Sequence, residues 1–209
     1  MFSLQTIFGK GDKFYGLLEA SAEAAHGASK ALVRMLQHSG KPGSLAEFQE
    51  AHSREKELAA KISAELVNTF VTVLEREDIE ALGASLYKIP KTISKFAERY
   101  SLTVERIGGV DFASRAQMLE KACEVIVEMV GQLRKGMNLE TTKDLNDKMQ
   151  AIEAEADRLI LEMYHESYAN ETDPMRYLIL KDLFEILETG IDKCRDAGNV
   201  IYQIVLKNS

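Results

Sequence analysis

The chain has 209 residues and a mass of 23.4 kDa, with 45% hydrophobic and 28% charged residues, a composition that excludes a wholly disordered protein. Its 26 basic and 33 acidic residues give a net charge of −7, which argues against a general nucleic-acid-binding face. No apolar run approaches the length of a transmembrane helix, and the low proline content with abundant Ala, Leu, Glu and Lys favours helices.

Two features of the sequence predict a cytoplasmic protein. Cys123 and Cys194 are isolated cysteines without CxxC spacing, which is typical of buried thiols in a reducing compartment. The first residues lack the basic region and the long apolar core of a secretory signal, so we expect none.

Apolar residues recur every three to four positions between five polar breaks, and we see no β-alternating segment. The pattern predicts an all-α protein with six long helices. The breaks lie at residues 39–43, 74–78, 107–111, 136–142 and 170–174. The expected helices span about 12–38, 45–73, 77–105, 114–136, 142–168 and 174–207.

Three helix starts carry capping signals. Ser44 with Glu47 and Ser114 with Gln117 match the capping box, in which each side chain satisfies an unpaired backbone donor. Asp173 is the expected N-cap of the last helix, with Pro174 at its first position.

The two halves of the sequence repeat. Leu18-Glu19 matches Leu119-Glu120 at an offset of 101 residues, and Glu55 matches Glu153 at an offset of 98. We therefore expect two tandem three-helix units, residues 1–108 and 109–209, that form one six-helix bundle. Two such units side by side present broad faces, which favours a homodimer or a higher homo-oligomer.

Five acids of the second half fall on one side of a predicted helical hairpin. Glu153 and Asp157 flank the apolar column of the fifth helix, and Glu188 and Asp192 flank that of the sixth, with Asp196 one turn further along. The two pairs are equidistant from the connecting loop, so they should lie level. No Lys or Arg stands four residues from Glu153, Asp157 or Asp192. A cation held by oxygen ligands would relieve the repulsion. The alternative is a solvated acidic face neutralised by lysines across the helices.

Three segments of the chain form a recognisable pattern: residues 152–159, residues 187–201 and residues 70–82. Together they resemble the PhoU-related family of Pit accessory proteins and phosphate transport regulators, and the resemblance covers essentially the whole chain. It implies duplicated three-helix bundles whose ExxxD motifs hold metal clusters. It therefore implies a divalent or trivalent ion, such as iron or zinc, at five residues: Glu153, Asp157, Glu188, Asp192 and Asp196.

The first half departs from this family pattern. Glu55 keeps its acid, but Ala59, Tyr87 and Lys91 replace the other three acids. The lysine ammonium could take the place of a cation, and Pro90 removes a helical hydrogen bond and should kink the third helix. We interpret the first-half site as lost.

The resemblance implies a non-enzymatic accessory or regulator of inorganic phosphate transport, with no catalytic residues. It would act on a Pit-type membrane transporter from the cytoplasm, in peripheral contact with the inner face of the membrane, and would bind no nucleic acid. A metal-dependent phosphohydrolase that uses the acidic cluster is the alternative. A ferritin-like di-iron site at the two ExxH motifs (Glu23 with His26, Glu162 with His165) is disfavoured, because these residues point away from the apolar columns.

Overall fold

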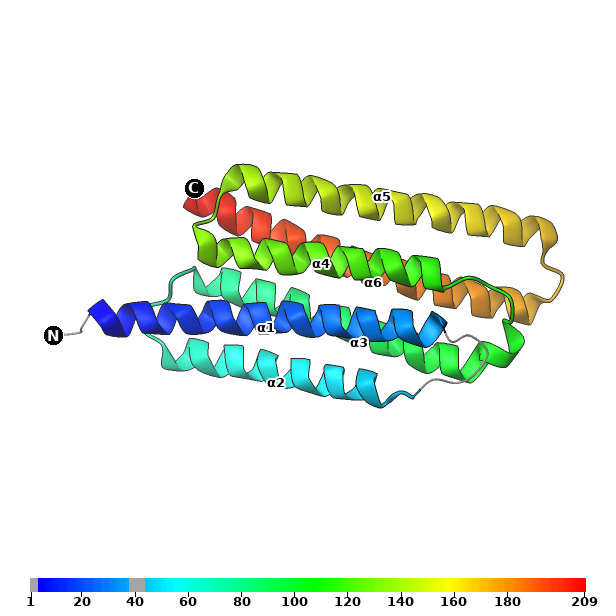
Figure 1. Cartoon of the computed structure of the whole chain (residues 1–209), viewed down its shortest axis with the longest axis horizontal. Coiled ribbons are helices and arrows are strands. Elements are labelled where there is room, and N and C mark those ends of the chain that lie inside the picture. Colours follow the sequence, from blue (N-terminus) through cyan, green and yellow to red (C-terminus); the bar gives the residue numbers. More distant parts are fainter. Residues whose placement is uncertain (1–3, 38–43) are drawn as a thin grey trace.

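The computed structural model describes residues 4–37 and 44–209, with side chains from residue 12 onward (Figure 1). Within these ranges the chain forms six α-helices, one 3-10 helix and no strand, so the all-α prediction is confirmed. The elements are α1 Leu4–Gln37, α2 Ala46–Asn68, α3 Arg76–Thr103, η1 Val104–Arg106, α4 Ala113–Lys135, α5 Leu139–Asn170 and α6 Pro174–Asn208. The predicted break at 39–43 lies outside the described residues. None of the described helices combines the length and the hydropathy needed to cross a bilayer.

Four helices form the centre of the bundle, and two lie outside it. Helix α1 packs against α4 and α3 packs against α6, while α1·α3 and α4·α6 contacts close the ring. Helix α2 covers α1 and α3 on one side, and α5 covers α4 and α6 on the other (Figure 1). The buried apolar residues of both halves form one cluster, so the two halves share a core. The expected boundary at residues 108 and 109 falls between η1 and α4, where Gly109 has a φ of 86°.

The burial of α5 and α6 follows their positions in the bundle. The apolar column of α6 is buried at every predicted position: Leu180, Phe184, Leu187, Ile191, Cys194, Gly198, Ile201 and Val205. The column of α5 alternates, with Met149, Ala156 and Met163 buried and the residues between them half-buried. Because α5 is covered on one side only, its flanks remain open for polar side chains.

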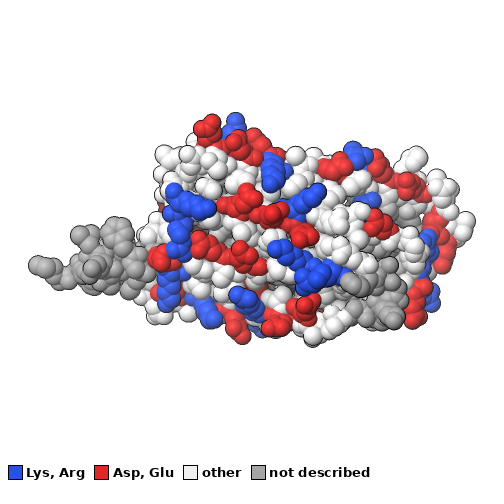
Figure 2. Space-filling model, viewed as in Figure 1, with Lys and Arg blue, Asp and Glu red and all other residues white. Residues whose placement is uncertain are grey.

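The surface charge is mixed on the face that α5, α4, α1 and α2 present in Figure 1. Figure 2 shows acidic and basic side chains interspersed over these helices rather than separated into fields of one sign. This face therefore has no large region of strongly positive or strongly negative electrostatic potential.

One of the three predicted caps is confirmed. The Asp173 side chain accepts a hydrogen bond from the Met175 N–H at 2.9 Å, with Pro174 at the first helical position. The capping box at Ser44 does not form as predicted: α2 begins after Leu45, and Glu47 pairs with Arg34, although the Ser44 hydroxyl accepts a hydrogen bond from the Ala46 N–H at 3.3 Å. The box at Ser114 is wrong as well: Asp111 accepts from the Ser114 N–H at 3.2 Å.

Tertiary packing explains the start of α4. Phe112 precedes the helix and is almost completely buried, and its ring stacks on that of Phe184 with centroids 4.6 Å apart. Burial of this ring fixes where the chain turns into the helix, so Ser114 lies inside the first turn instead of before it.

Helix α2 ends at Asn68, five residues earlier than expected. The segment that follows, Thr69 to Val73, is rich in β-branched residues, which disfavour helix. The Arg76 guanidinium donates hydrogen bonds to the carbonyl oxygens of Leu66 and Thr69, which satisfies acceptors left open at the end of the helix. Helix α3 runs continuously through Pro90.

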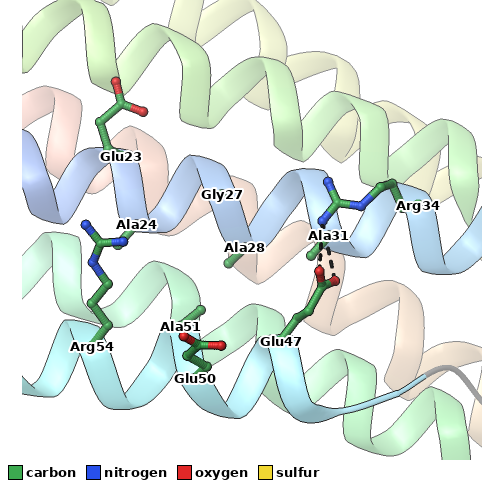
Figure 3. Close-up of a pocket in the computed structure, with 10 residues that line it drawn as sticks. All are labelled: Glu23, Ala24, Gly27, Ala28, Ala31, Arg34, Glu47, Glu50, Ala51 and Arg54. Carbon is green, nitrogen blue, oxygen red and sulfur yellow. Dashed lines mark hydrogen bonds and ion pairs between the residues drawn. The ribbon is translucent and has the colours of Figure 1, made fainter.

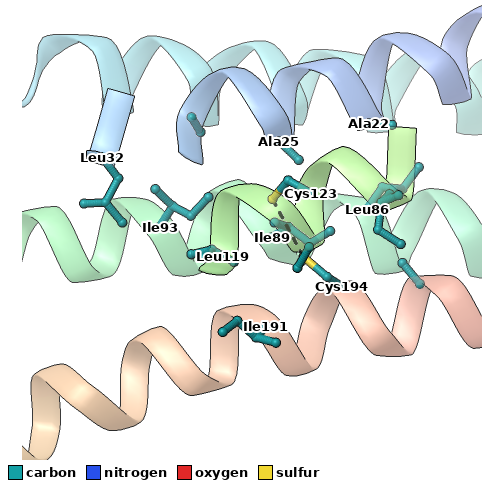
Figure 4. Packing of buried hydrophobic residues seen from close by; sticks show 14 of the residues in the cluster. Ala22, Ala25, Leu32, Leu86, Ile89, Ile93, Leu119, Cys123, Ile191 and Cys194 are labelled. Carbon is teal, nitrogen blue, oxygen red and sulfur yellow. Dashed lines mark hydrogen bonds between the residues drawn. The ribbon is translucent and has the colours of Figure 1, made fainter. Parts of the chain in front are cut away.

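The two cysteines meet in the core between α4 and α6 (Figure 4). Both are fully buried, as the sequence predicted, and their Sγ atoms lie 3.7 Å apart. The contact itself was not predicted, because the residues are 71 positions apart in the sequence. The contact with Cys123, together with burial, raises the pKa of the Cys194 thiol well above its ordinary value.

This burial makes the thiols unreactive in the folded protein. A thiol-specific disulfide reagent should label neither Cys123 nor Cys194 in native buffer at mildly alkaline pH, because the thiolate is the reacting form. In denaturing guanidinium chloride it should label two thiols per chain. Rapid labelling of the native protein would contradict the packing of α4 against α6.

Candidate functional site

The predicted acids lie along the packed pair α5 and α6. Glu153 and Asp157 project from α5, and Glu188, Asp192 and Asp196 from α6; Asp157 is exposed and the others are half-buried. Burial raises the pKa of the Glu188 carboxyl. The charges of four neighbouring carboxylates raise it further: Asp192, Asp157, Glu185 and Glu153. Four of the five predicted acids therefore share one electrostatic neighbourhood.

An arginine that the sequence reasoning missed lies among these acids. Arg195 Nη1 lies 2.5 Å from Glu153 Oε1, and Nη2 lies 3.4 Å from Asp192 Oδ1 and 3.3 Å from Asp196 Oδ1. Burial lowers the pKa of Arg195, but the three acids outweigh it, so the pKa is raised and the guanidinium stays charged. The signal was present in the sequence, since Arg195 stands three residues from Asp192 and one from Asp196.

Asp196 is bound on a second side by a lysine. Lys193 Nζ donates to Asp196 Oδ2 at 3.0 Å. Burial raises the pKa of Asp196, while Lys193 and Arg195 lower it by more, so the carboxylate is stabilised in its charged form. Asp196 is thus held by two cations of its own helix.

The carboxylate oxygens match the ligand preference of a hard cation. As the side chains stand, however, residues 12–37 and 44–209 contain no group of three or more His, Cys, Asp or Glu placed to hold a metal ion. Arg195 links Glu153 on α5 to Asp192 and Asp196 on α6, so a cation that bound all three would displace its guanidinium. The alternative interpretation was an acidic face neutralised by lysines across the helices. In the structure this arginine, rather than a lysine, supplies the positive charge between the two helices.

The first-half residues are arranged differently. Tyr87 Oη lies 3.4 Å from His52 Nε2, and Lys91 Nζ lies 6.0 Å from the centre of the Tyr87 ring. No ion pair joins Lys91 to Glu55 in the described structure, so the lysine does not neutralise the remaining acid as the sequence suggested.

Glu55 is completely buried in the core. Neither carboxyl oxygen has a hydrogen-bond partner among the described residues, and the Ser21 hydroxyl is likewise buried without one. Burial raises the pKa of Glu55 to about 7, against smaller opposing effects of Ser21 and Arg54. The spacing of Phe48, Glu55 and Ile62 on α2 follows one helical stripe, and this signal could have revealed the burial.

The two ExxH motifs remain on the surface, as predicted. Glu23 and His165 are exposed, His26 is half-buried, and Glu162 is exposed and pairs with Arg158.

A shallow groove of about 320 Å³ lies on the surface where α1 and α2 pack together (Figure 3). Its floor consists of small residues, and its rim carries Arg34 and Arg54 together with three acids: Glu23, Glu47 and Glu50. Arg34 pairs with Glu47 at 3.4 Å. The acids outnumber the arginines, so the groove lacks the excess positive charge that would favour a phosphate.

Comparison with solved structures defines the class of fold. A PhoU-like protein from Shewanella oneidensis MR-1 matches with a TM-score of 0.78 at 15% identity, over 93% of this chain and 99% of that one. A structure from the same organism, described as "a putative PhoU-like phosphate regulatory protein", matches with the same TM-score at 16% identity and the same coverage. The chain therefore has the PhoU-like fold. No family model matches it.

Two curated relatives are similar in sequence. The "UPF0111 protein YkaA" of Bacillus subtilis (strain 168) is 27% identical over 151 residues, which is 69% of this chain and 70% of the relative. The "Putative pit accessory protein" of Rhizobium meliloti (strain 1021) is 22% identical over 204 residues, 94% of both chains. The predicted resemblance to PhoU-like proteins and Pit accessory proteins is confirmed.

The buried carboxyl of Glu55 should make the free energy of unfolding depend on pH. Its pKa rises from 4.5 to about 7 on folding, so the folded state favours the protonated form. The stability that this preference contributes is fully present below pH 4.5 and is lost as the pH rises through about 7, a total decline of about 3 kcal/mol. Glu55→Gln should remove this decline and stabilise the protein at neutral pH, measured by urea unfolding between acid and neutral pH. The exposed Glu57→Gln is the control and should unfold like the wild type. A Glu55→Gln variant that keeps the decline would contradict the assignment.

Proposed function

We propose that this chain is a non-enzymatic accessory protein that regulates inorganic phosphate transport from the cytoplasmic side of a Pit-type membrane transporter. The observation that carries the proposal is the similarity to the Rhizobium protein named "Putative pit accessory protein", which extends over 94% of both chains. The PhoU-like fold supports it, since one of the Shewanella proteins with this fold is described as a phosphate regulatory protein.

We propose further that the acid cluster binds a divalent or trivalent cation, such as iron or zinc. Five acids face two cationic side chains in the cluster, Arg195 and Lys193, so negative charge is left over. Burial first, and then repulsion from the neighbouring carboxylates, raises the pKa of Glu188, and a cation would relieve that repulsion. The ligands would come from Glu153, Asp157, Glu188, Asp192 and Asp196, with Arg195 released to solvent.

Deletion of the gene in its native cells tests the regulatory role. Uptake of radiolabelled inorganic phosphate should change severalfold, and a plasmid copy of the wild-type chain should restore it. Uptake that is identical with and without the chain would refute the proposal. Hydrolysis of phosphoesters by the purified, metal-loaded protein would replace it with the phosphohydrolase alternative.

Two substitutions of opposite effect test the cation site. Asp192→Asn should abolish most metal binding, because it removes a central anionic donor, while Arg195→Gln should tighten binding about tenfold, because it removes the competing guanidinium. Metal per chain and thermal melts with and without chelator provide the measurements. Without metal, Asp192→Asn should cost little stability, since it also relieves repulsion.

Glu55→Gln is the matched control for the cation site and should leave the metal content unchanged. Equal losses from Glu55→Gln and Asp192→Asn would contradict the asymmetry between the two halves. A wild-type melt that is indifferent to metal and chelator would favour the ion-paired acidic face.

A further inference from the structure

Four exposed apolar side chains gather where α2 passes into α3. Val67, Phe70, Val71 and Val73 are 85%, 97%, 57% and 37% exposed, and we call residues 67–73 the apolar loop. Single apolar residues are common on protein surfaces, whereas several exposed apolar side chains gathered together are typical of an interaction surface. Phe70 is the most exposed of the large apolar side chains in the described structure.

The apolar loop is held in a fixed shape. Thr69, inside the loop, and Leu74, directly after it, are almost completely buried and anchor the loop to the bundle. Thr72 Oγ1 donates to the Leu74 carbonyl oxygen at 2.7 Å, and Thr69 Oγ1 donates to Glu65 Oε1 at 3.2 Å. Together with the hydrogen bonds that Arg76 makes to backbone carbonyls, these contacts order the loop with its apolar side chains outward. A preordered surface loses little conformational entropy when it binds.

The apolar loop lies at one tip of the elongated bundle. Figure 1 places the α2–α3 connection at the same end as the C-terminus and opposite the α5–α6 connection. A partner can therefore bind at this tip without covering the acid cluster, which lies along α5 and α6.

The segment of chain that contains the apolar loop carries more acids than bases. Residues 65–80 contain five acids and one base, and that base, Arg76, is committed to backbone carbonyls. Lys13 pairs with Glu65, and Lys207 pairs with Glu75 at 3.2 Å and Asp78 at 2.8 Å. The two remaining acids of this segment, Glu77 and Glu80, are exposed and form no ion pair within the described part of the chain.

We propose that the apolar loop docks into an apolar pocket bordered by Lys and Arg on the cytoplasmic face of the membrane transporter. Cytoplasmic loops of membrane proteins carry an excess of Lys and Arg, which complements the acidic border of the loop. The anionic headgroups of the cytoplasmic leaflet repel that same border, so a bare bilayer is the poorer partner. The choice of partner rests on the proposed function in phosphate transport.

Cosedimentation of the purified full-length chain with membranes tests the docking surface. The probes are inside-out membrane vesicles from the native cells and protein-free vesicles of phosphatidylethanolamine and phosphatidylglycerol. The wild type should bind the native vesicles saturably, lose that binding when the vesicles are first treated with trypsin, and not bind the protein-free vesicles. The double variant Phe70→Ser, Val71→Ser should bind about tenfold more weakly or less.

The matched control is the double variant Leu102→Ser, Leu178→Ser. These leucines are 85% and 55% exposed, and Leu102 lies at the other end of α3, so this variant should bind like the wild type. Both double variants should melt like the wild type, because the side chains they change are exposed. Glu77→Lys should weaken binding severalfold by reversing one charge of the acidic border.

Three results would overturn the proposal. Equal binding to protein-free vesicles would make the loop a lipid-binding element. Unchanged binding of the Phe70, Val71 double variant would remove the loop from the interface. A wild-type dimer that the same variant converts to monomer, measured by sedimentation, would assign the loop to contacts between copies of the chain.

The membrane-binding and phosphate-uptake measurements distinguish failure of the docking surface from failure of the proposed function. If loss of the chain changes phosphate uptake but the loop variant binds membranes normally, the docking surface is wrong and the proposed function stands. If loop-dependent binding to trypsin-sensitive membranes occurs but phosphate uptake never depends on the chain, the docking surface stands and the proposed function is wrong.

Discussion

The apolar faces of α1, α3, α4 and α6 are buried against one another, and every other feature of the molecule depends on that shared core. Since α1 packs on α4 and α3 on α6, neither half covers its central helices alone. The outer helices α2 and α5 are each covered on one side, which leaves their flanks available to charged residues. The acid cluster exists because α5 is such an outer helix: it packs against α6, while the side of α5 that carries Glu153 and Asp157 stays partly open to solvent.

The features that depend on periodicity could be predicted, and those that depend on contacts between helices could not. The spacing of apolar residues located six helices and the buried column of α6, because burial requires that spacing. The start of α4 is set by the burial of Phe112 against Phe184, a contact far apart in the sequence. The contact between Cys123 and Cys194 depends on how α4 and α6 are rotated, which no single-helix pattern records. Heptad phase predicted the acids of the cluster but not Arg195, because this arginine lies three residues from Asp192 rather than four and reaches Glu153 on the other helix.

The two halves neutralise equivalent acids by different chemistry. Glu55 in the first half lies in the core, where burial favours its protonated form. Glu153, its counterpart in the second half, stays near the surface and pairs with Arg195. One acid is thus compensated by a proton and the other by a guanidinium. The sequence match between Glu55 and Glu153 pairs two residues of the same type in different surroundings, so the position alone does not determine the role.

Arg195 also bears on which ions could occupy the cation site proposed at the acid cluster. The guanidinium already supplies one positive charge and three ion-pair contacts, so a monovalent ion such as sodium or potassium gains nothing in charge by replacing it. An ion with two or three charges does gain, because each carboxylate attracts it more strongly than it attracts the arginine. At the proposed cation site, Arg195 would therefore favour a divalent or trivalent ion over the abundant monovalent ions of a cell, and no size-selective cavity would be needed.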